Sequence, residues 1–379
     1  MNQSHRPLQG IVVVELGNSV AAPVAGQILA QLGAEVVKIE KPSGDDARRW
    51  GPPFLDGLSP IFQAVNMDKR SWAIDLSDTA QRTNLVSFIQ DRADVVLQNA
   101  RPGKLESLGL GATALCSLKP SLIYCNLGAF GSKGPLRDQP GYDPLMQAFS
   151  GIMSVVGEPS GPSVRVGPAI VDIGTGMWAA LGIMAALLQK RDTGKGNTVD
   201  VSLFETAIGW MSLHAANFLT SGEIPKKLGS GQMGIAPYRA YQTADLELVV
   251  AAGNDKLFSG FADVLEHPEW TADPRFSSNP SRVRNSAVLN KMIEEIMLRC
   301  PAADWAARLE QVGVPCAPVQ NVQQMLEHPQ TQALDILQEV AGCSRRLVGL
   351  PISFGGSRPK PARSAPKLDK PVSSALRQR

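Results

Sequence analysis

The N-terminal third of the chain alternates between short apolar runs and segments with apolar residues at helical spacing. Ile11–Leu16 is interrupted only by Glu15, a pattern typical of a strand buried on both faces. Val20–Leu32 predicts a helix that Gly33 ends. Strands are predicted at Ile11–Leu16, Val36–Glu40, Trp72–Leu76, Asp94–Asn99 and Leu122–Leu127. This alternation predicts an α/β fold with a parallel sheet.

From Tyr142 onward the pattern becomes mainly helical. We expect long helices at Asp143–Val156 and Gly174–Lys190, and a strand at Asn197–Leu203 that leads into a helix ending near Leu219. The segment Thr220–Gly234 is rich in Gly, Ser, Lys and Pro, as expected for a linker or mobile loop.

The remainder predicts a smaller α+β region followed by short strands and turns. A hairpin is expected around Ala244-Asp245, and the helices that follow are expected at Asp255–Leu265, Asn285–Arg299 and Ala302–Gln311. Short strands and turns begin near Asn321, and Ser357–Arg379, with four prolines and seven basic residues, is predicted to be extended or disordered. We therefore divide the chain into residues 1–220, 221–320 and 321–379.

Composition and charge exclude several functional classes. With 44% hydrophobic residues the chain has ample core material, and its net charge of +2 is too balanced for a dedicated nucleic-acid or membrane-surface binder. Met1–Gly10 holds no apolar signal-peptide region. The longest apolar run, Met177–Leu188, has 12 residues, where a membrane span needs roughly 20. We expect no contact with nucleic acid or membrane.

Cysteine and histidine are few and scattered. The five cysteines form no CxxC pair, and none of the four histidines lies at metal-ligand spacing from them. We expect no metal site and no disulfide framework. Free thiols without a signal peptide favour a cytoplasmic protein.

The first strand, helix and second strand favour a nucleotide-type ligand without fixing which one. Glu40 ends the second strand where a dinucleotide-binding fold places its ribose-binding acid. However, the loop Gly17–Pro23 lacks the GxGxxG pattern, which argues against a nicotinamide dehydrogenase. Small residues at a helix N-terminus still let some phosphate-bearing or adenine-bearing ligand approach closely.

Three further stretches are candidates for chemistry, each with a plainer structural interpretation. Gly128–Asp143 follows a strand and lies where α/β folds bind ligands, or is a surface loop. Asp172 precedes glycines and an apolar helix, so it is either a helix N-cap or a carboxylate nucleophile. The glycines of Leu228–Gly234 either direct backbone N–H groups at an oxyanion or belong to a flexible linker.

Taken together, these residues resemble the class III CoA-transferases, the CaiB/BaiF family, from Leu8 to about Gly355. No single stretch is decisive, but their order and spacing carry the resemblance. The matching stretches are Leu32–Glu40, Lys69–Ser71, Asn99–Gly103, Pro140–Asp143, Asp172–Met177, Thr193–Gly196 and Gly313–Pro318.

The resemblance implies a Rossmann-like large domain, made by residues 1–220 and 321–379, a small α+β domain, and an obligate homodimer of two interlocked chains. It implies a transferase that uses coenzyme A and acyl-CoA as substrates, with no tightly bound cofactor. Asp172 matches the family's catalytic aspartate, and Gly229 and Gly231 match the loop that covers it. The residues matched to CoA contacts are Val20, Ala21, Lys41, Asn99, Arg101, Tyr142 and Asp143.

The resemblance also separates alternative activities. Family racemases have histidine where this chain has Tyr142, and a tyrosine, with an ordinary pKa of about 10, is a poor general base at neutral pH. An acyl-CoA racemase and a non-catalytic acyl-CoA-binding protein remain the alternatives to a transferase.

Substrate choice is predicted from local likeness. Gly44–Phe54, Ala236–Thr243 and Ala251–Asn254 look most like the succinyl-CoA:glutarate branch, which implies succinyl-CoA as donor and a small dicarboxylate as acceptor. A distal carboxylate needs a cationic partner. Our candidates for it are Arg48, Arg165 and Arg239.

Overall fold

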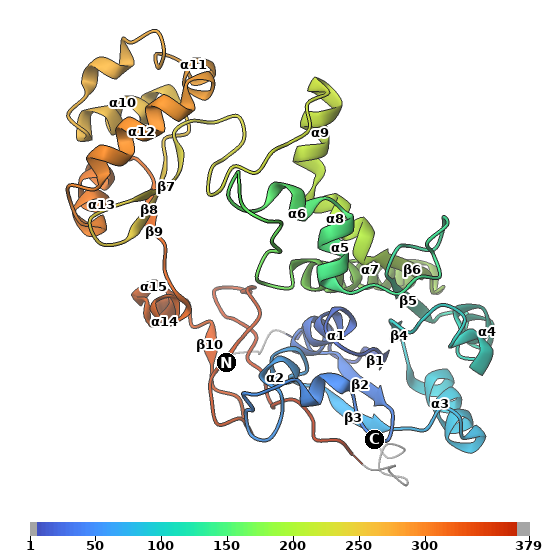
Figure 1. Cartoon of the computed structure of the whole chain (residues 1–379). Helices are drawn as coiled ribbons and strands as arrows, with labels where there is room; N and C mark the ends of the chain where they lie inside the picture. Colours follow the sequence, from blue (N-terminus) through green and yellow to red (C-terminus); the bar gives the residue numbers. More distant parts are fainter. Residues whose placement is uncertain (1–5, 370–379) are drawn as a thin grey trace. The chain divides into compact units, whose positions relative to one another are not determined.

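The computed structural model describes residues 6–369 and divides into two compact units (Figure 1). The first comprises the chain up to Ile152, then Arg165–Glu223, and then the chain from Pro329 onward. The second comprises Met153–Val164 and Ile224–His328. The segment Met153–Val164 thus belongs to the second unit, although the chain before it and the chain after it belong to the first. Our division of the sequence placed this segment within residues 1–220.

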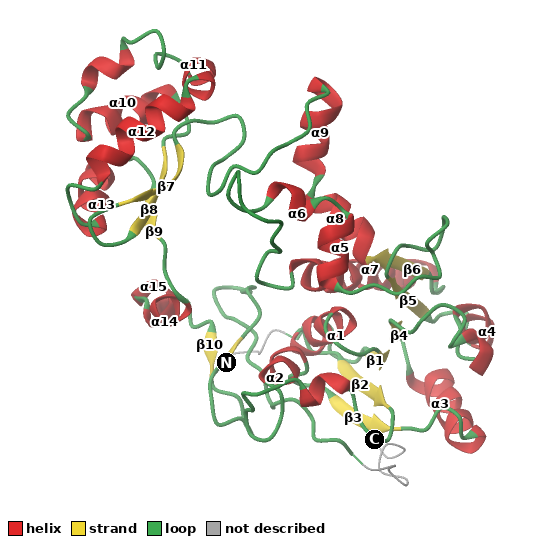
Figure 2. Cartoon of the chain, viewed as in Figure 1, coloured by secondary structure: helices red, strands yellow, loops and turns green. Residues whose placement is uncertain are grey.

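The first unit is built on a six-stranded parallel sheet in the order β3-β2-β1-β4-β5-β6 (Figure 2). The predicted parallel α/β sheet is confirmed, with β3 beginning two residues earlier than expected. From β1 the successive strands are added toward one edge of the sheet as far as β3, and from β4 onward toward the other edge. The order therefore reverses between β1 and β4, and folds of this kind usually bind ligands at the carboxyl ends of the strands at this point. The strands are β1 Val12–Leu16, β2 Glu35–Glu40, β3 Arg70–Ala73, β4 Val95–Gln98, β5 Ile123–Gly128 and β6 Thr198–Ser202.

Helices and short 3₁₀ turns connect these strands. Two expected helices are interrupted: the first breaks at Gly151, which has φ +90°, and the second at Met211. The elements are α1 Ala21–Gln31, η1 Asp46–Arg49, α2 Pro60–Val65, α3 Thr79–Arg92, η2 Glu106–Leu108, α4 Ala112–Leu118, α5 Asp143–Phe149, α6 Ile152–Val155, α7 Ile170–Thr193, α8 Leu203–Trp210 and α9 Ser212–Ser221.

Helix α7 is the longest element and packs closely against α1 and the sheet. By length and composition alone its 24 residues are sufficient to cross a membrane. Two glycines explain the close packing: a Cβ at Gly176 would lie 2.7 Å from the Ala21 carbonyl oxygen, and one at Gly182 would lie 2.7 Å from a Val199 methyl. The side of α7 that carries these glycines is therefore buried within this unit, whereas Met177, Trp178 and Leu181 of the same helix are exposed.

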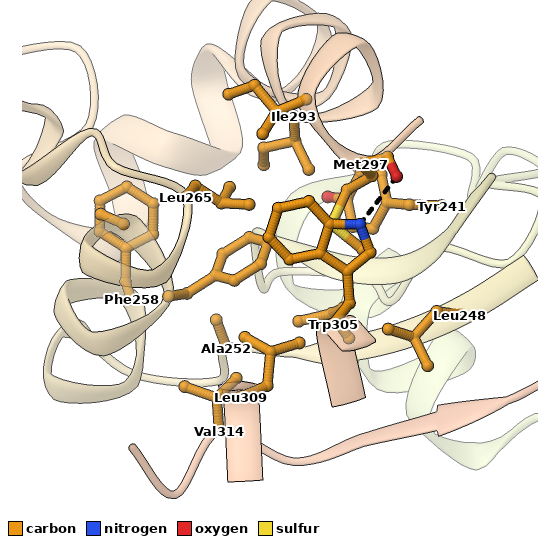
Figure 3. Packing of buried hydrophobic residues seen from close by; sticks show 14 of the residues in the cluster. Tyr241, Leu248, Ala252, Phe258, Leu265, Ile293, Met297, Trp305, Leu309 and Val314 are labelled. Atoms are coloured by element: carbon orange, nitrogen blue, oxygen red, sulfur yellow. Dashed lines mark hydrogen bonds between the residues drawn. The ribbon is translucent and has the colours of Figure 1, made fainter. Parts of the chain in front are cut away.

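The second unit has a three-stranded antiparallel sheet, and five helical segments lie between the second and third strands of this sheet. The predicted hairpin is confirmed, and β9 joins it as a third strand. Trp305 lies in the centre of the core, where its indole N–H donates to the Met297 carbonyl at 2.8 Å (Figure 3). The elements are β7 Tyr238–Gln242, β8 Glu247–Ala251, α10 Asp255–Val264, η3 Pro268–Thr271, α11 Asn279–Arg284, α12 Ser286–Met297, α13 Ala302–Gln311 and β9 Cys316–Pro318.

The C-terminal region differs from the expectation of strands and turns. Two short helices come first, α14 Val322–Glu327 and α15 Pro329–Ala333, followed by strands β10 Leu337–Gln338 and β11 Leu347–Val348. A capping box of Asn321 and Gln324 begins α14. Residues 358–369 contain no helix or strand, as expected for the tail, and residues 370–379 lie outside the described part.

The described part of the tail is nevertheless held in place. The Asp68 carboxylate accepts hydrogen bonds from the backbone N–H groups of Ala362 and Arg363 at 2.7 and 3.0 Å. The Arg48 guanidinium donates to the Pro366 carbonyl at 2.9 Å. The tail is thus part of the first unit.

Candidate active site

The turn between β1 and α1 lies at the carboxyl edge of the sheet. Val20 is the N-cap of α1, and its side chain makes no capping hydrogen bond. The Asn99 amide accepts from the Asn18 N–H at 3.0 Å and donates to the Asn18 carbonyl at 2.9 Å. Of the residues matched to CoA contacts, Val20 and Ala21 therefore form the start of the helix, and Asn99 holds the turn that precedes it.

Two exposed cations follow β2 and β4, the strands on either side of β1. Lys41 follows β2 and forms an ion pair with Asp46 at 2.8 Å, with about half of its side chain exposed. Arg101 follows β4, is exposed, and makes no ion pair within residues 6–369. Both are placed where a phosphate-bearing ligand would meet them.

Asp172 lies in the first turn of α7, where α5 fixes its backbone. The Asp143 carboxylate accepts from the N–H groups of Val171 and Asp172 at 2.8 and 3.1 Å, and thus caps α7 from another helix. Gln147 donates to the same carboxylate at 2.6 Å and accepts from the Val166 N–H at 2.8 Å. Asp172 is therefore not an N-cap, the plainer role considered from the sequence.

The Asp172 carboxyl is half-buried. Burial, together with the negative charge of Asp143, raises its pKa from 3.8 to about 7. A carboxyl that titrates near neutrality is typical of functional sites, because both protonation states are then available. At pH above 7 it is mainly a carboxylate, the form in which such a group can serve as a nucleophile.

The packing of α1 against α7 brings the two parts of the site together. Gly176, one helical turn after Asp172, lies against the Ala21 carbonyl and the Val24 side chain at the start of α1. The N-terminal ends of both helices therefore lie at the same edge of the first unit. Both helix dipoles favour negative charge at these ends.

Tyr142 and Asp143, matched to CoA contacts by sequence, differ in their surroundings. Tyr142 is 62% exposed at the N-cap of α5. Asp143 is buried, and its carboxylate is engaged with Gln147 and the start of α7. The structure thus gives Asp143 a part in holding and tuning Asp172.

Gly229 and Gly231 lie in the second unit, in a loop with internal hydrogen bonds. The Gly229 N–H donates to the Gly157 carbonyl at 3.0 Å, and the Gly231 N–H donates to the Leu228 carbonyl at 2.9 Å. Gly229 has φ +61°, and a Cβ there would lie 2.7 Å from a Glu158 carboxylate oxygen. Only glycine fits this position without strain. In this conformation neither N–H is free for an oxyanion.

The three arginines considered as partners of a distal carboxylate differ in their burial and contacts. Arg48 is buried and forms a two-point ion pair with Glu40, at 2.7 and 2.6 Å, so the expectation that it binds substrate is wrong. Arg239, in the second unit, lies 3.8 Å from Glu294. Arg165 is exposed and donates to backbone carbonyls just before α7.

The sequence analysis missed a cluster of buried charges beneath the β1–α1 turn. Lys38 and Lys69 share the Glu15 carboxylate at 3.1 and 2.8 Å, and Lys38 also contacts Asp45 at 3.0 Å. The signal was present, because Glu15 and Lys38 each interrupt a buried strand and the two strands are neighbours. No group of His, Cys, Asp or Glu suited to a metal occurs in residues 6–369.

A half-buried carboxyl that titrates near neutrality, in a fold built on a parallel sheet, is the kind of feature found in the active sites of α/β enzymes. Comparison with known proteins identifies the family of this chain. Residues 8–371 match CoA-transferase family III, so the chain belongs to this family and is a CoA-transferase.

Individual relatives agree with the assignment. The chain is 33% identical to the human succinyl-CoA:glutarate CoA-transferase, over 98% of this chain and 86% of that protein. It is 35% identical to the acetyl-CoA:oxalate CoA-transferase of Acetobacter aceti, over 98% and 95%. A CaiB/BaiF family protein from Brucella suis has a similar structure, with a TM-score of 0.87 and 36% identity over 98% of both chains.

Proposed function

We propose that this enzyme transfers CoA from succinyl-CoA to a small dicarboxylic acid through a thioester of CoA with Asp172. The observation that carries the proposal is the half-buried Asp172, whose pKa of about 7 provides a reactive carboxylate near neutral pH. The family assignment supports the transfer of CoA. The names of several relatives, which pair succinyl-CoA with a dicarboxylate, support the choice of substrates.

The chemistry begins with attack of an Asp172 carboxylate oxygen on the thioester carbonyl of the donor. The C–S bond breaks, which gives a mixed anhydride and free CoA thiolate. The thiolate then attacks the aspartyl carbonyl and releases succinate, leaving an aspartyl-CoA thioester. The acceptor carboxylate attacks this thioester and expels the thiolate, which finally attacks the acceptor carbonyl and regenerates Asp172. No proton is gained or lost overall, and the thioester energy is conserved.

The surroundings of Asp172 suit this sequence of steps. Burial removes water that would hydrolyse the anhydride, and it makes the carboxylate more reactive by depriving it of solvation. Asp143 holds the nucleophile's backbone, while the N-terminal end of α7 favours the negative charge that develops at the aspartyl group.

CoA is proposed to bind at the carboxyl edge of the sheet. Lys41 and Arg101 are exposed cations suited to its phosphates. Val20 and Ala21, small or apolar residues at the start of α1, admit the ligand closely. In this arrangement Asn99 acts through the turn that it holds.

Arg165 is the proposed partner of the acceptor's distal carboxylate. It is exposed and lies seven residues before Asp172, and within residues 6–369 its guanidinium donates to the backbone carbonyls of Val166 and Gly167. Arg165→Gln is expected to raise the KM of a dicarboxylate acceptor and also the KM of succinyl-CoA, because the succinyl group carries a distal carboxylate of the same kind.

We further infer that the active form is a homodimer, interlocked as the resemblance implies. Helices α7, α8 and α9 expose large apolar side chains, which usually mark an interface. Light scattering after size exclusion tests the dimer, since a monomer mass would contradict it. The exposed residues include Met177, Trp178, Leu181, Leu188, Trp210, Leu213 and Leu219.

We also infer that the protein works in the cytoplasm. All five cysteines are free thiols in the structure, which suits a reducing compartment. Localisation of a tagged protein by fractionation tests this inference.

The decisive experiment is the intact mass of the enzyme incubated with succinyl-CoA and no acceptor. Wild type should gain the mass of CoA less one water, and Asp172→Ala should not. Asp192→Ala, an exposed aspartate on the same helix, should gain the adduct like wild type. CoA binding without any adduct in wild type would reject the covalent mechanism and favour a racemase or a non-catalytic binder.

A further inference from the structure

Side chains from three separate segments hold the turn between β1 and α1. Lys38 of β2 donates to the Gly17 carbonyl at 2.6 Å, and the Asp45 carboxylate accepts from the Ser19 N–H at 3.2 Å. Asn99 holds the residue between them. Ser19 has φ +65°, a conformation uncommon for a residue other than glycine. Such a conformation persists only where the surroundings impose it. Here the surroundings hold Ser19 and the two residues before it, each by a hydrogen bond with a side chain.

The lysine that holds this turn is buried and charged. Its side chain has no exposed surface, and its Nζ lies 3.1 Å from Glu15 and 3.0 Å from Asp45. Burial alone would lower the pKa of Lys38, but the neighbouring carboxylates outweigh burial and raise it. Lys38 therefore keeps its ammonium group and its three donors, one each for Glu15, Asp45 and the turn.

A second lysine provides a natural comparison. Lys69 is equally buried and lies 2.8 Å from the other oxygen of Glu15. Its remaining bonds go to the Pro23 carbonyl, within α1, and to the Asn66 side chain. Lys69 thus shares the Glu15 carboxylate with Lys38 without touching the turn.

Stability alone does not account for this cluster. Well-packed apolar residues of similar volume often replace buried ion pairs without loss. What Lys38 adds is a connection, because one buried ammonium group donates to the Gly17 carbonyl and also contacts the Asp45 carboxylate, and so holds the two together. The carboxylate so fixed, Asp45, is the one that holds the Ser19 N–H.

We propose that Lys38 is a positioning residue for acyl-CoA binding: by fixing Gly17 and Asp45 it sets the turn that presents Val20 and Ala21 to CoA. This inference rests on the proposed binding of CoA at this edge. Lys38 itself is buried and does not touch CoA. Loss of Lys38 loosens the turn and weakens binding, while Asp172 and its helix stay in place.

The test compares Lys38→Met with Lys69→Met. Each variant removes one buried charge and leaves Glu15 paired with the other lysine. Lys38→Met also leaves the buried Asp45 carboxylate without its ammonium partner, so its thermal stability should fall further than that of Lys69→Met. The Kd for free CoA, measured by calorimetry, should rise at least tenfold in Lys38→Met and stay within threefold of wild type in Lys69→Met. The rate of adduct formation at saturating succinyl-CoA should stay within threefold in both.

An unchanged Kd in Lys38→Met, or an equal rise in both variants, would overturn the proposal. If Lys38→Met does not fold, Asp45→Ala and Asp45→Asn replace it. The asparagine keeps an oxygen for the Ser19 N–H, so only the alanine variant should lose tenfold in affinity, and equal affinities would refute the proposal. Because CoA binding is measured separately from the adduct, failure of the covalent mechanism is distinguishable from failure of this inference.

Discussion

Replacement of Asp172 by asparagine should stabilise the folded enzyme at pH 8. The folded-state pKa of about 7 lies above the ordinary value of 3.8, so the folded protein binds this proton more tightly than the unfolded chain does. The stability that Asp172 contributes is therefore fully present below pH 4 and is lost as the pH rises through 7. Asparagine has nearly the same shape and does not titrate.

The magnitude follows from the two pKa values. The interval between 3.8 and about 7 corresponds to roughly 4 kcal/mol at about 1.4 kcal/mol per pH unit. Because the side chain is half-buried, solvent screens part of this, and we expect Asp172→Asn to gain about 1–3 kcal/mol at pH 8. The gain should shrink steadily toward pH 4.

Urea unfolding of wild type and Asp172→Asn at pH 8, 6.5 and 5 measures the difference. Asp192→Asn, exposed near the end of the same helix, should stay within about 0.5 kcal/mol of wild type at each pH. Equal or lower stability of Asp172→Asn at pH 8 would show that Asp172 is not held in an unfavourable charged state. The explanation of its reactivity by burial would then be refuted.

Three further outcomes are expected. Gly176→Ala should lower the free energy of unfolding by about 1–3 kcal/mol, because its Cβ would lie 2.7 Å from a backbone oxygen of α1. Gly209→Ala in α8 meets open space and should raise the free energy of unfolding by up to about 1 kcal/mol. Thermal unfolding compares the two variants, and equal shifts in melting temperature would contradict the packing argument. Asp143→Asn keeps the cap of α7 but removes a negative charge, so the acidic limb of the pH profile for adduct formation at Asp172 should move to lower pH, and an unmoved limb would contradict that coupling. Trp305→Ala should lower the free energy of unfolding of the second unit by about 3–5 kcal/mol, and Trp305→Phe should lower it less. A loss below about 1 kcal/mol for the alanine variant would show that this core repacks.

The sheet was predictable because its strands are short apolar runs separated by helical patterns. All six strands of the parallel sheet were located, and burial on both faces leaves a strong signal in sequences such as that of Val12–Leu16. The breaks in helices were not, because they depend on single positions such as Gly151, whose positive φ the apolar pattern does not record. The helix at Val322–Glu327 was missed although its capping box was readable.

The candidate site was predictable in its residue types but not in its contacts. Resemblance pointed to Asp172, and the structure adds the burial and the second carboxylate that raise its pKa. Arg48 was misjudged because the sequence does not show that it is buried and paired with Glu40, eight residues earlier, and with the carbonyl of Pro366, 318 residues later. The contact with Pro366 follows from tertiary folding and leaves no local pattern.

The anchored tail has a consequence for how the protein is made. Asp68 cannot form its hydrogen bond with Arg363 until that residue, 295 positions later in the chain, has been synthesised. At about 5–20 residues per second, a ribosome needs roughly 15–60 s to supply it. During that time the nascent sheet lacks the C-terminal segment whose backbone contacts Arg48 and Asp68. The whole second unit is synthesised in the same interval. Completion of the first unit is therefore a late event in synthesis, because it requires the segment that contains Arg363 and Pro366.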